Sequence, residues 1–194
     1  HLLLYGNYAK NILKNDYNYP NTSVVYNSLD LDAQLRLRTS INKQKPLLNQ
    51  KYIIFIGRIE KRKRIDLLLK AYNMLLSDNR FSSLNLVIVG DGTQLDDLKK
   101  KYSDPKIHFL GAVYEEGVIA NYLYNAQILV SPGHVGLNVM HALTYGTPVI
   151  THDNFKNHAP EFEAIIPKKT GDFFEENSLT DLTKVVMTWL DKDI

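Results

Sequence analysis

The sequence predicts an α/β fold built on a doubly wound, mostly parallel sheet. Three observations predict it. Short apolar segments alternate with amphipathic helical segments along the 194 residues. Most of the short segments are apolar throughout and rich in β-branched residues, which is typical of strands that helices cover on both faces. The connections between the segments are short, as they are in βαβ units.

Each predicted element follows from its own pattern. An apolar run predicts a strand, and apolar residues at helical spacing predict a helix, such as the face formed by Ile65, Leu68 and Tyr72. In chain order we expect strands at 23–27 (SVVYN) and 52–57 (YIIFIG), a helix at about 64–79, a strand at 84–90 (LNLVIVG), a helix at 94–102, a strand at 107–111 (IHFLG), a helix at 115–125, a strand at 127–132 (QILVSP), a helix at 136–145, a strand at 147–152 (TPVITH) and a helix at 178–191. The opening LLLYGNYAKNILK (2–14) also has a helical pattern.

The two ends suggest how the chain is divided. It opens on His1 without a methionine and stops at TWLDKDI inside a helical pattern. We therefore expect an excised domain that is truncated at its C-terminus.

Composition narrows the function classes. The apolar fraction of 44% and the charged fraction of 23% are typical of a globular domain. The formal net charge of +2 provides no global field for nucleic acid or for an anionic membrane. The absence of cysteine excludes disulfides and thiolate metal sites and favours a reducing compartment. No apolar run is long enough to cross a bilayer.

The polar residues of interest collect where strands end. The segments GRIEKRKR (57–64), GDGTQ (90–94), SPGHVG (131–136) and HDNFKNH (152–158) each follow a predicted strand. Ligands of open parallel sheets bind beyond the carboxyl ends of the strands. Four such loops at one edge therefore predict a binding site there.

The basic loop at 57–64 is the first candidate. Arg58 sits at the mouth of a strand and Lys63 at a helix start, so both can converge on one anion, and a diphosphate fits them best. Arg62 and Arg64 are expected to face water. The alternative is a solvated charge run without a ligand.

Two glycine loops offer further backbone contacts. In VGDGTQLDDL, Leu95 replaces the third glycine of a dinucleotide fingerprint, so the loop is a weak nicotinamide signature. Gly133 and Gly136 are expected to leave backbone N–H groups accessible at a helix start, where an anion is favoured.

Two histidines lie in the same region, His134 before the helix and His141 inside it. The nearest carboxylates, Asp153 and Glu161, form no recognisable metal spacing with them, so we expect no metal site. Taken alone, His141 is either a packed or surface histidine or a ligand-binding one.

Five motifs carry a family resemblance. They are VVYNSLD, YIIFIGRIEKRKRIDLLLKAYNML, LNLVIVGDGTQLDDLKK, IHFLGAV and GLNVMHALTYGTPVI, in that order. From about residue 20 onward the chain resembles the nucleotide-sugar-binding domain of retaining GT-B glycosyltransferases of family 4. The resemblance implies the Rossmann-like C-terminal half of the GT-B fold. Residues 1–20 would be a trailing helix or linker from a missing N-terminal acceptor domain, and residues 21–194 would form the domain that binds the nucleotide sugar.

The resemblance also implies roles for individual residues. Arg58 and Lys63 match the basic pair that holds the donor diphosphate and supports catalysis, following Gly57 at the end of the strand. Gly136 and Leu137 match the helix start whose amides contact the diphosphate. Backbone at Ala112 and Val113 would lie beside the nucleobase.

The sequence departs from the family at two glutamates that are eight positions apart. Gly133 and His141 stand in their places. A neutral imidazole at His141 can still bind ribose hydroxyls, and His134 is placed to approach the sugar. Glu161 resembles another family position near the donor, although a helix-capping or surface role is the alternative.

The resemblance implies sugar transfer from a nucleotide-diphosphate sugar with retention and without a metal or other cofactor. We expect a role in surface polysaccharide or lipopolysaccharide biosynthesis. The missing domain would bind a glycan or lipid-linked acceptor, so this fragment alone would be inactive. A cytoplasmic protein with peripheral membrane association at the inner face is expected, with no nucleic-acid partner. Two alternatives remain: a non-catalytic nucleotide-sugar-binding module of a glycan assembly complex, or a sugar-nucleotide epimerase of the same fold.

Overall fold

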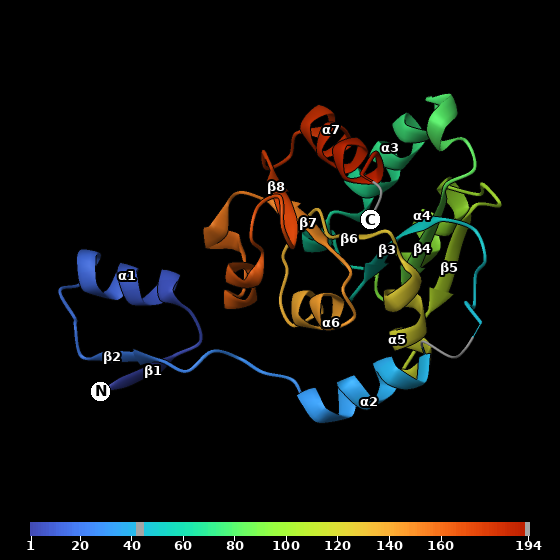
Figure 1. Cartoon of the computed structure of the whole chain (residues 1–194). Coiled ribbons are helices and arrows are strands. Elements are labelled where there is room, and N and C mark those ends of the chain that lie inside the picture. Colours follow the sequence, from blue (N-terminus) through green and yellow to red (C-terminus); the bar gives the residue numbers. More distant parts are fainter. Residues whose placement is uncertain (42–44, 193–194) are drawn as a thin grey trace.

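A six-stranded parallel sheet forms the centre of the molecule and confirms the predicted fold class (Figure 1). The computed structural model describes residues 1–41 and 45–192. The strand order is β5-β4-β3-β6-β7-β8, and every pair is parallel. The strands are β3 (Tyr52–Ile56), β4 (Asn85–Val89), β5 (Ile107–Gly111), β6 (Ile128–Val130), β7 (Val149–His152) and β8 (Gly171–Phe174).

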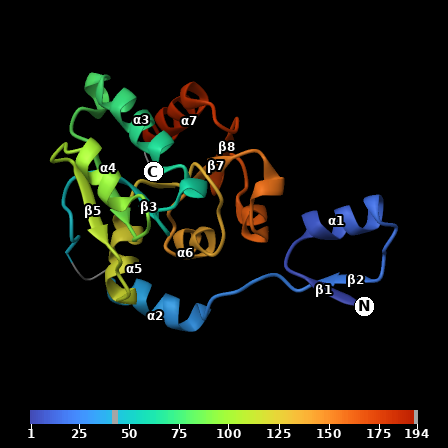
Figure 2. The same cartoon turned by 180° about the vertical axis from the view of Figure 1, so that it is seen from behind.

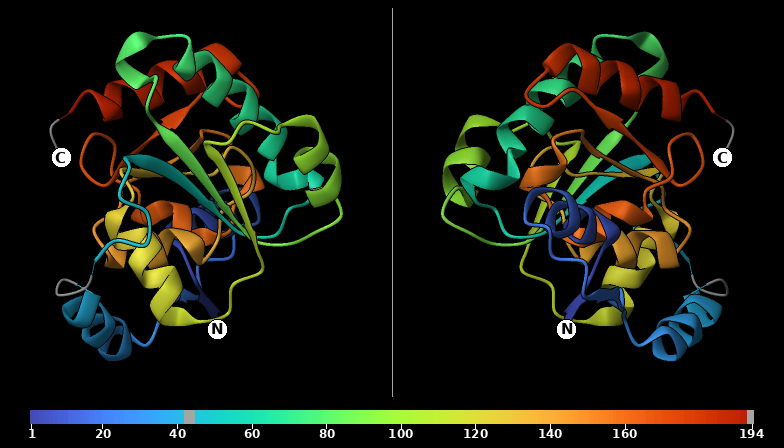
Figure 3. Two further views of the ribbon diagram at one scale, coloured as in Figure 1. Left: turned by 90° about the vertical axis from the view of Figure 1, so that its right-hand side faces the viewer. Right: turned by 90° about the vertical axis from the view of Figure 1, so that its left-hand side faces the viewer.

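Helices cover both faces of this sheet because successive strand residues point to opposite sides. Ile53 and Phe55 of β3 belong to the core shared with α3 (Ile65–Leu76), α4 (Leu95–Lys101) and α7 (Leu179–Leu190). Ile54 belongs to the opposite core, which includes buried residues of α5 (Glu116–Asn125) and α6 (Asn138–Thr144). Figure 3 shows α3 and α7 on one side of the sheet and α5 and α6 on the other.

The N-terminal segment forms a smaller unit of its own (Figures 1 and 2). Strand β1 (Leu2–Leu4) pairs in parallel with β2 (Thr22–Val24), and helix α1 (Asn7–Asp16) crosses between them. The strand predicted at 23–27 is confirmed at its start, but it belongs to this two-stranded sheet and not to the main sheet. It ends at Val24, and Tyr26 has a positive φ of 39°, which is outside the extended region.

The helix predicted from residue 2 is wrong for its first turn. Leu2–Leu4 bond to the strand beside them, and α1 begins only at Asn7, where the Glu163 carboxylate accepts the backbone N–H groups of Asn7 and Tyr8. A contact over about 155 residues of sequence leaves no local signal.

Two elements escape the sequence analysis. Helix α2 (Leu31–Ile41) is capped by Asp30, whose carboxylate accepts the N–H of Ala33 at 3.0 Å. Strand β8 begins at Gly171, where an added Cβ would lie 2.0 Å from the carbonyl oxygen of Val149. Gly171 permits the close pairing of β8 with β7. It is not an apolar, β-branched residue, so it also interrupts the pattern by which a strand is predicted.

None of the helices within residues 1–41 and 45–192 combines the length and apolar character needed to span a bilayer.

Candidate functional site

Backbone hydrogen bonds join the loops that follow β3 and β4. The N–H of Ile59 donates to the carbonyl of Asp91 at 2.8 Å, and the N–H of Gln94 donates to the carbonyl of Ile59 at 3.1 Å. Gly90 has a φ of +141°, and an added Cβ there would lie 1.8 Å from the carbonyl oxygen of Gly57. Gly90 therefore serves the close approach of two loops, and the edge of the sheet is preassembled.

A main cleft of about 520 Å³ opens at this edge, between the loops after β3, β4 and β5. It is lined by Ile56, Gly57, Arg58, Glu60, Val89, Gly90, Asp91, Gly92, Ala112, Val113 and Tyr114. Four predicted site residues therefore meet here: Gly57, Arg58, Ala112 and Val113. The Arg58 side chain is 78% exposed, so it is accessible to a ligand, and it forms a long ion pair with Glu60 at 3.7 Å.

A smaller apolar pocket of about 160 Å³ adjoins the main cleft, with which it shares Ile56 and Gly57. Ile119 and Leu123 of α5 and His141 of α6 line it. Burial lowers the pKa of His141 below its ordinary value, against the opposing effect of the Glu116 charge. A neutral imidazole beside a cleft can both donate to and accept from hydroxyl groups.

Lys63 does not line the main cleft. Its side chain is buried, and Nζ donates to the carbonyl oxygen of His134 at 2.6 Å. Burial is the first cause that lowers the pKa of Lys63 and the Arg62 charge the second, while Glu60 acts in the opposite direction. The 3₁₀ segment η1 (Lys61–Lys63) is thereby tied to the loop that precedes α6. An ammonium group carries three protons, so further hydrogen bonds from Nζ are open to a ligand.

Gly133 packs against the same 3₁₀ segment. An added Cβ would lie 2.0 Å from the carbonyl oxygen of Arg62, and the N–H of His134 donates to that oxygen at 3.2 Å. Gly133 is buried and serves loop packing, and it also lines the second cleft described below. Its contact with an anion stays a prediction. In this loop no side chain fits at position 133.

Gly136 also differs from its expectation. Its N–H donates to the Asn138 side-chain oxygen at 3.0 Å, so the group is occupied rather than accessible. Leu137 is exposed, and the helix that follows it has only seven residues.

Three histidines line a second cleft of about 500 Å³ beyond β7 and β8, together with Arg62, Arg64 and Lys156. They are His134, His152 and His158. His158 Nδ1 accepts the N–H of Val135 at 3.2 Å, and Nε2 bonds to the carbonyl of His152 at 2.9 Å. Burial lowers the pKa of His158 to about 4, against the effect of its backbone hydrogen bond. His158 thus holds the loop before α6 in place, a role the sequence analysis missed.

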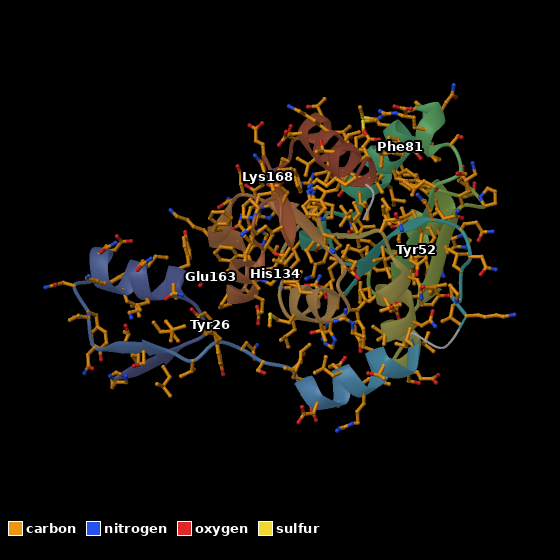
Figure 4. The ribbon with its side chains drawn as sticks, in the orientation of Figure 1. Tyr26, Tyr52, Phe81, His134, Glu163 and Lys168 are labelled. Carbon is orange, nitrogen blue, oxygen red and sulfur yellow. The ribbon has the colours of Figure 1, made fainter. Side chains whose placement is uncertain are left out.

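Burial, followed by the charges of Lys63 and Arg62, lowers the pKa of His134, while Glu161 opposes the shift. His134 Nδ1 is buried and has no hydrogen-bond partner among the described residues. The histidine therefore stays neutral near pH 7 with one ring nitrogen unused. Figure 4 shows it in the body of the domain.

Glu161 lies in the 3₁₀ segment η4 (Pro160–Ala164) and is buried. Its Oε1 accepts from the Asn27 side chain at 2.8 Å, whereas Oε2 has no partner within residues 1–41 and 45–192. An added Cβ on Gly136 would lie 4.0 Å from Oε2, so the carboxylate is next to the loop before α6. It does not cap a helix or face water.

The described part of the chain contains no cluster of three or more histidine, aspartate or glutamate side chains placed to hold a metal ion.

The family model described as "Glycosyl transferases group 1" matches residues 38–194. The glycogen synthase of Cellvibrio japonicus (strain Ueda107) is 31% identical over 130 residues, which are 63% of this chain and 25% of the synthase. The chain thus spans about a quarter of that relative.

Two solved structures are similar in fold. The C-terminal domain of the glycosyl transferase group 1 family protein LpcC from Francisella tularensis has a TM-score of 0.64 and 19% identity, over 85% of this chain and 89% of that domain. HepE of Anabaena, solved with UDP and glucose, has a TM-score of 0.70 and 14% identity, over 98% of this chain and 53% of its own. At these identities the matches show the fold alone.

Proposed function

Because the chain belongs to the group 1 glycosyl transferases, we propose that it binds the nucleotide-diphosphate sugar of a retaining, metal-independent sugar transfer. The observation that carries the proposal is the preassembled main cleft, with the exposed Arg58 guanidinium at its rim and His141 in the pocket beside it.

The two adjoining cavities suggest how the nucleotide lies. The nucleobase occupies the main cleft beside the backbone of Ala112 and Val113, next to Gly57. The ribose hydroxyls reach His141, whose neutral ring both donates and accepts. The HepE structure contains UDP and glucose, which supports a nucleoside diphosphate as the ligand class.

The diphosphate lies between Arg58 and Lys63. Arg58 offers a planar fork for phosphate oxygens, and Lys63 offers the protons of Nζ that His134 does not use. We infer a further contact from the amide of Leu137, whereas that of Gly136 requires the Asn138 side chain to move away.

In the transfer, the bond between the anomeric carbon and the diphosphate oxygen breaks, and the diphosphate leaves with the electron pair. An acceptor hydroxyl attacks the anomeric carbon from the face that the diphosphate leaves, and its proton passes to an oxygen of the leaving diphosphate. Arg58 and Lys63 stabilise the charge that develops on the leaving diphosphate, which is the largest contribution this chain supplies.

The remaining parts of the reaction belong to the rest of the protein. We infer that residues 1–20 lead out of an acceptor domain that binds a glycan or lipid-linked acceptor. The described fragment alone is then inactive. Surface polysaccharide or lipopolysaccharide synthesis at the inner face of a membrane fits such an acceptor.

Calorimetric titration with UDP, GDP, ADP, CDP and dTDP tests the proposal, with NAD as a control. We expect selective binding of one diphosphate and weaker binding after His141→Ala. Absence of binding to all five, in this chain and in the full-length protein, would refute it.

A non-catalytic nucleotide-sugar-binding module is the second candidate. Gly133 and His141 stand where the family resemblance implies glutamates, and position 133 has no room for a side chain. Sugar transfer or donor hydrolysis by the full-length protein would exclude this candidate. Nucleotide binding without turnover over a broad set of donors and acceptors would favour it.

A further inference from the structure

The side chain of Asn138 bridges two loops where the strand order of the main sheet reverses. The chain passes from β3 outward to β4 and β5, and then crosses to β6 on the other side of β3. Open α/β sheets bind ligands in the crevice at such a reversal. Asn138 belongs to α6, which follows β6, yet its Nδ2 donates to the carbonyl oxygen of Ile56 at the end of β3 at 3.4 Å. The asparagine therefore lies across the crevice in which a ligand is expected.

The same side chain occupies a backbone amide outside the helix. A capping asparagine accepts N–H groups that follow it in the chain, in the first turn of its helix. The direction is reversed here, because Oδ1 of Asn138 accepts the N–H of Gly136, two residues before it, at 3.0 Å. A neutral amide oxygen thus holds an N–H group of the loop that the proposed function assigns to the diphosphate.

Asn138 also lies beside the proposed path of the nucleotide. It lines the apolar pocket of His141 together with Ile56 and Gly57, and these two residues line the main cleft as well. The side chain is half-buried, so it is packed in place and still adjoins the cavity. A nucleotide that reaches from the main cleft to His141 passes this side chain.

The two hydrogen bonds of Asn138 are unequal, and a phosphate can replace the stronger one. The bond to Gly136 has an ordinary length, whereas the bond to Ile56 is longer than the usual limit of about 3.2 Å. A charged phosphate oxygen forms a hydrogen bond about twice as strong as that of a neutral amide oxygen. A diphosphate can therefore displace Oδ1 from the Gly136 amide, whereas an uncharged nucleoside cannot.

We propose that Asn138 is a latch on the diphosphate site: it holds the Gly136 amide until a nucleoside diphosphate displaces it. The inference rests on the proposed function, which places the diphosphate at the loop before α6. A latch lowers the apparent affinity by the fraction of molecules in which it is open. One neutral hydrogen bond corresponds to about a fivefold change in affinity. The latch therefore weakens diphosphate binding about fivefold, and by competing with the product diphosphate it favours product release.

Calorimetric titration of the full-length protein tests the latch, with the nucleoside diphosphate that it selects and with the corresponding nucleoside. Asn138→Ala removes the competing oxygen, so the affinity for the diphosphate should rise about fivefold while that for the nucleoside stays unchanged. Asn138→Asp keeps the shape but places a carboxylate at the same amide. Its charge repels the diphosphate, whose affinity should fall about tenfold or more.

Three readouts separate a latch from a structural asparagine. Asn73→Ala removes an exposed asparagine of α3 and should change neither affinity. Asn138→Ala should lower the melting temperature while it raises diphosphate affinity, whereas loss of a purely structural side chain would lower both. In the wild type, where no variant has to fold, the NMR signals of the Asn138 side-chain NH₂ should shift on addition of the diphosphate and stay in place on addition of the nucleoside.

The failures of the latch and of the proposed function are distinguishable. If no nucleoside diphosphate binds the wild type or the variants, the proposed function fails and the inference fails with it. If a diphosphate binds but Asn138→Ala leaves its affinity unchanged or lowers it, only the latch is overturned. Unchanged Asn138 signals in the diphosphate-bound wild type overturn it as well, and they decide alone if the variant does not fold.

Discussion

Gly133→Ala tests how the loop before α6 is held. The added methyl carbon would lie 2.0 Å from the carbonyl oxygen of Arg62, a distance that backbone must relieve by moving. The movement separates two hydrogen-bonded pairs. The N–H of His134 donates to the carbonyl oxygen of Arg62 at 3.2 Å, and Lys63 Nζ donates to the carbonyl oxygen of His134 at 2.6 Å.

The magnitude follows from these two bonds. A neutral backbone bond contributes about 1 kcal/mol and a bond from a charged donor about 1.5–3 kcal/mol. Gly133→Ala should therefore lower the free energy of unfolding by about 3 kcal/mol. It should also weaken nucleotide diphosphate binding, because Lys63 loses the contact that orients it.

Urea unfolding followed by the fluorescence of Trp189, the single tryptophan and a buried one, provides the assay. Gly117→Ala is the matched control. Gly117 lies in α5 with no heavy atom within 4 Å of an added Cβ, so this change should stabilise by about 0.5–1 kcal/mol. Equal unfolding free energies for Gly133→Ala and the wild type would refute the account of the loop.

Three further predictions follow from other contacts. Gly90→Ala should disrupt the edge of the sheet, since its Cβ would lie 1.8 Å from the carbonyl oxygen of Gly57, and both the melting temperature and diphosphate affinity should fall. His158 has a pKa lowered from 6.5 to about 4, so the unfolded chain takes up its proton first as the pH falls. The free energy of unfolding should thus decrease by about 2–3 kcal/mol from pH 6.5 to pH 4 because of this group. In His158→Gln, urea unfolding measured at several pH values should show a smaller decrease over the same range. Glu163→Gln should weaken the cap of α1, and hydrogen exchange of the Tyr8 amide should accelerate about tenfold while the amides of α3 stay protected.

The fold was largely predictable because buried parallel strands leave a strong local pattern. Continuous apolar runs such as YIIFI mark strands whose two faces are both covered. Strand β8 and helix α2 were not predictable in this way. Strand β8 begins with a glycine that packing requires, and helix α2 is held by side-chain contacts with residues far along the chain. Gln34 of α2, for example, accepts from the Tyr145 hydroxyl at 2.6 Å.

The site was predictable only as a set of strand-end loops. Topology brings Arg58, Ala112 and Val113 to one cleft, as the pattern implies. The partner of Lys63 lies 71 residues away and that of Glu161 134 residues away, so neither contact has a signature in the sequence. Spacing alone likewise does not reveal that Asn138 occupies the amide of Gly136.

The most direct test of the donor site compares a nucleoside diphosphate with its monophosphate by calorimetry. If Arg58 and Lys63 hold the second phosphate, the wild type should prefer the diphosphate by about tenfold or more, and Arg58→Ala should abolish most of that preference. Arg36→Ala, at an exposed arginine of α2, is the control and should retain it. Equal affinity of the wild type for the two nucleotides, or an unchanged preference in Arg58→Ala, would contradict the account.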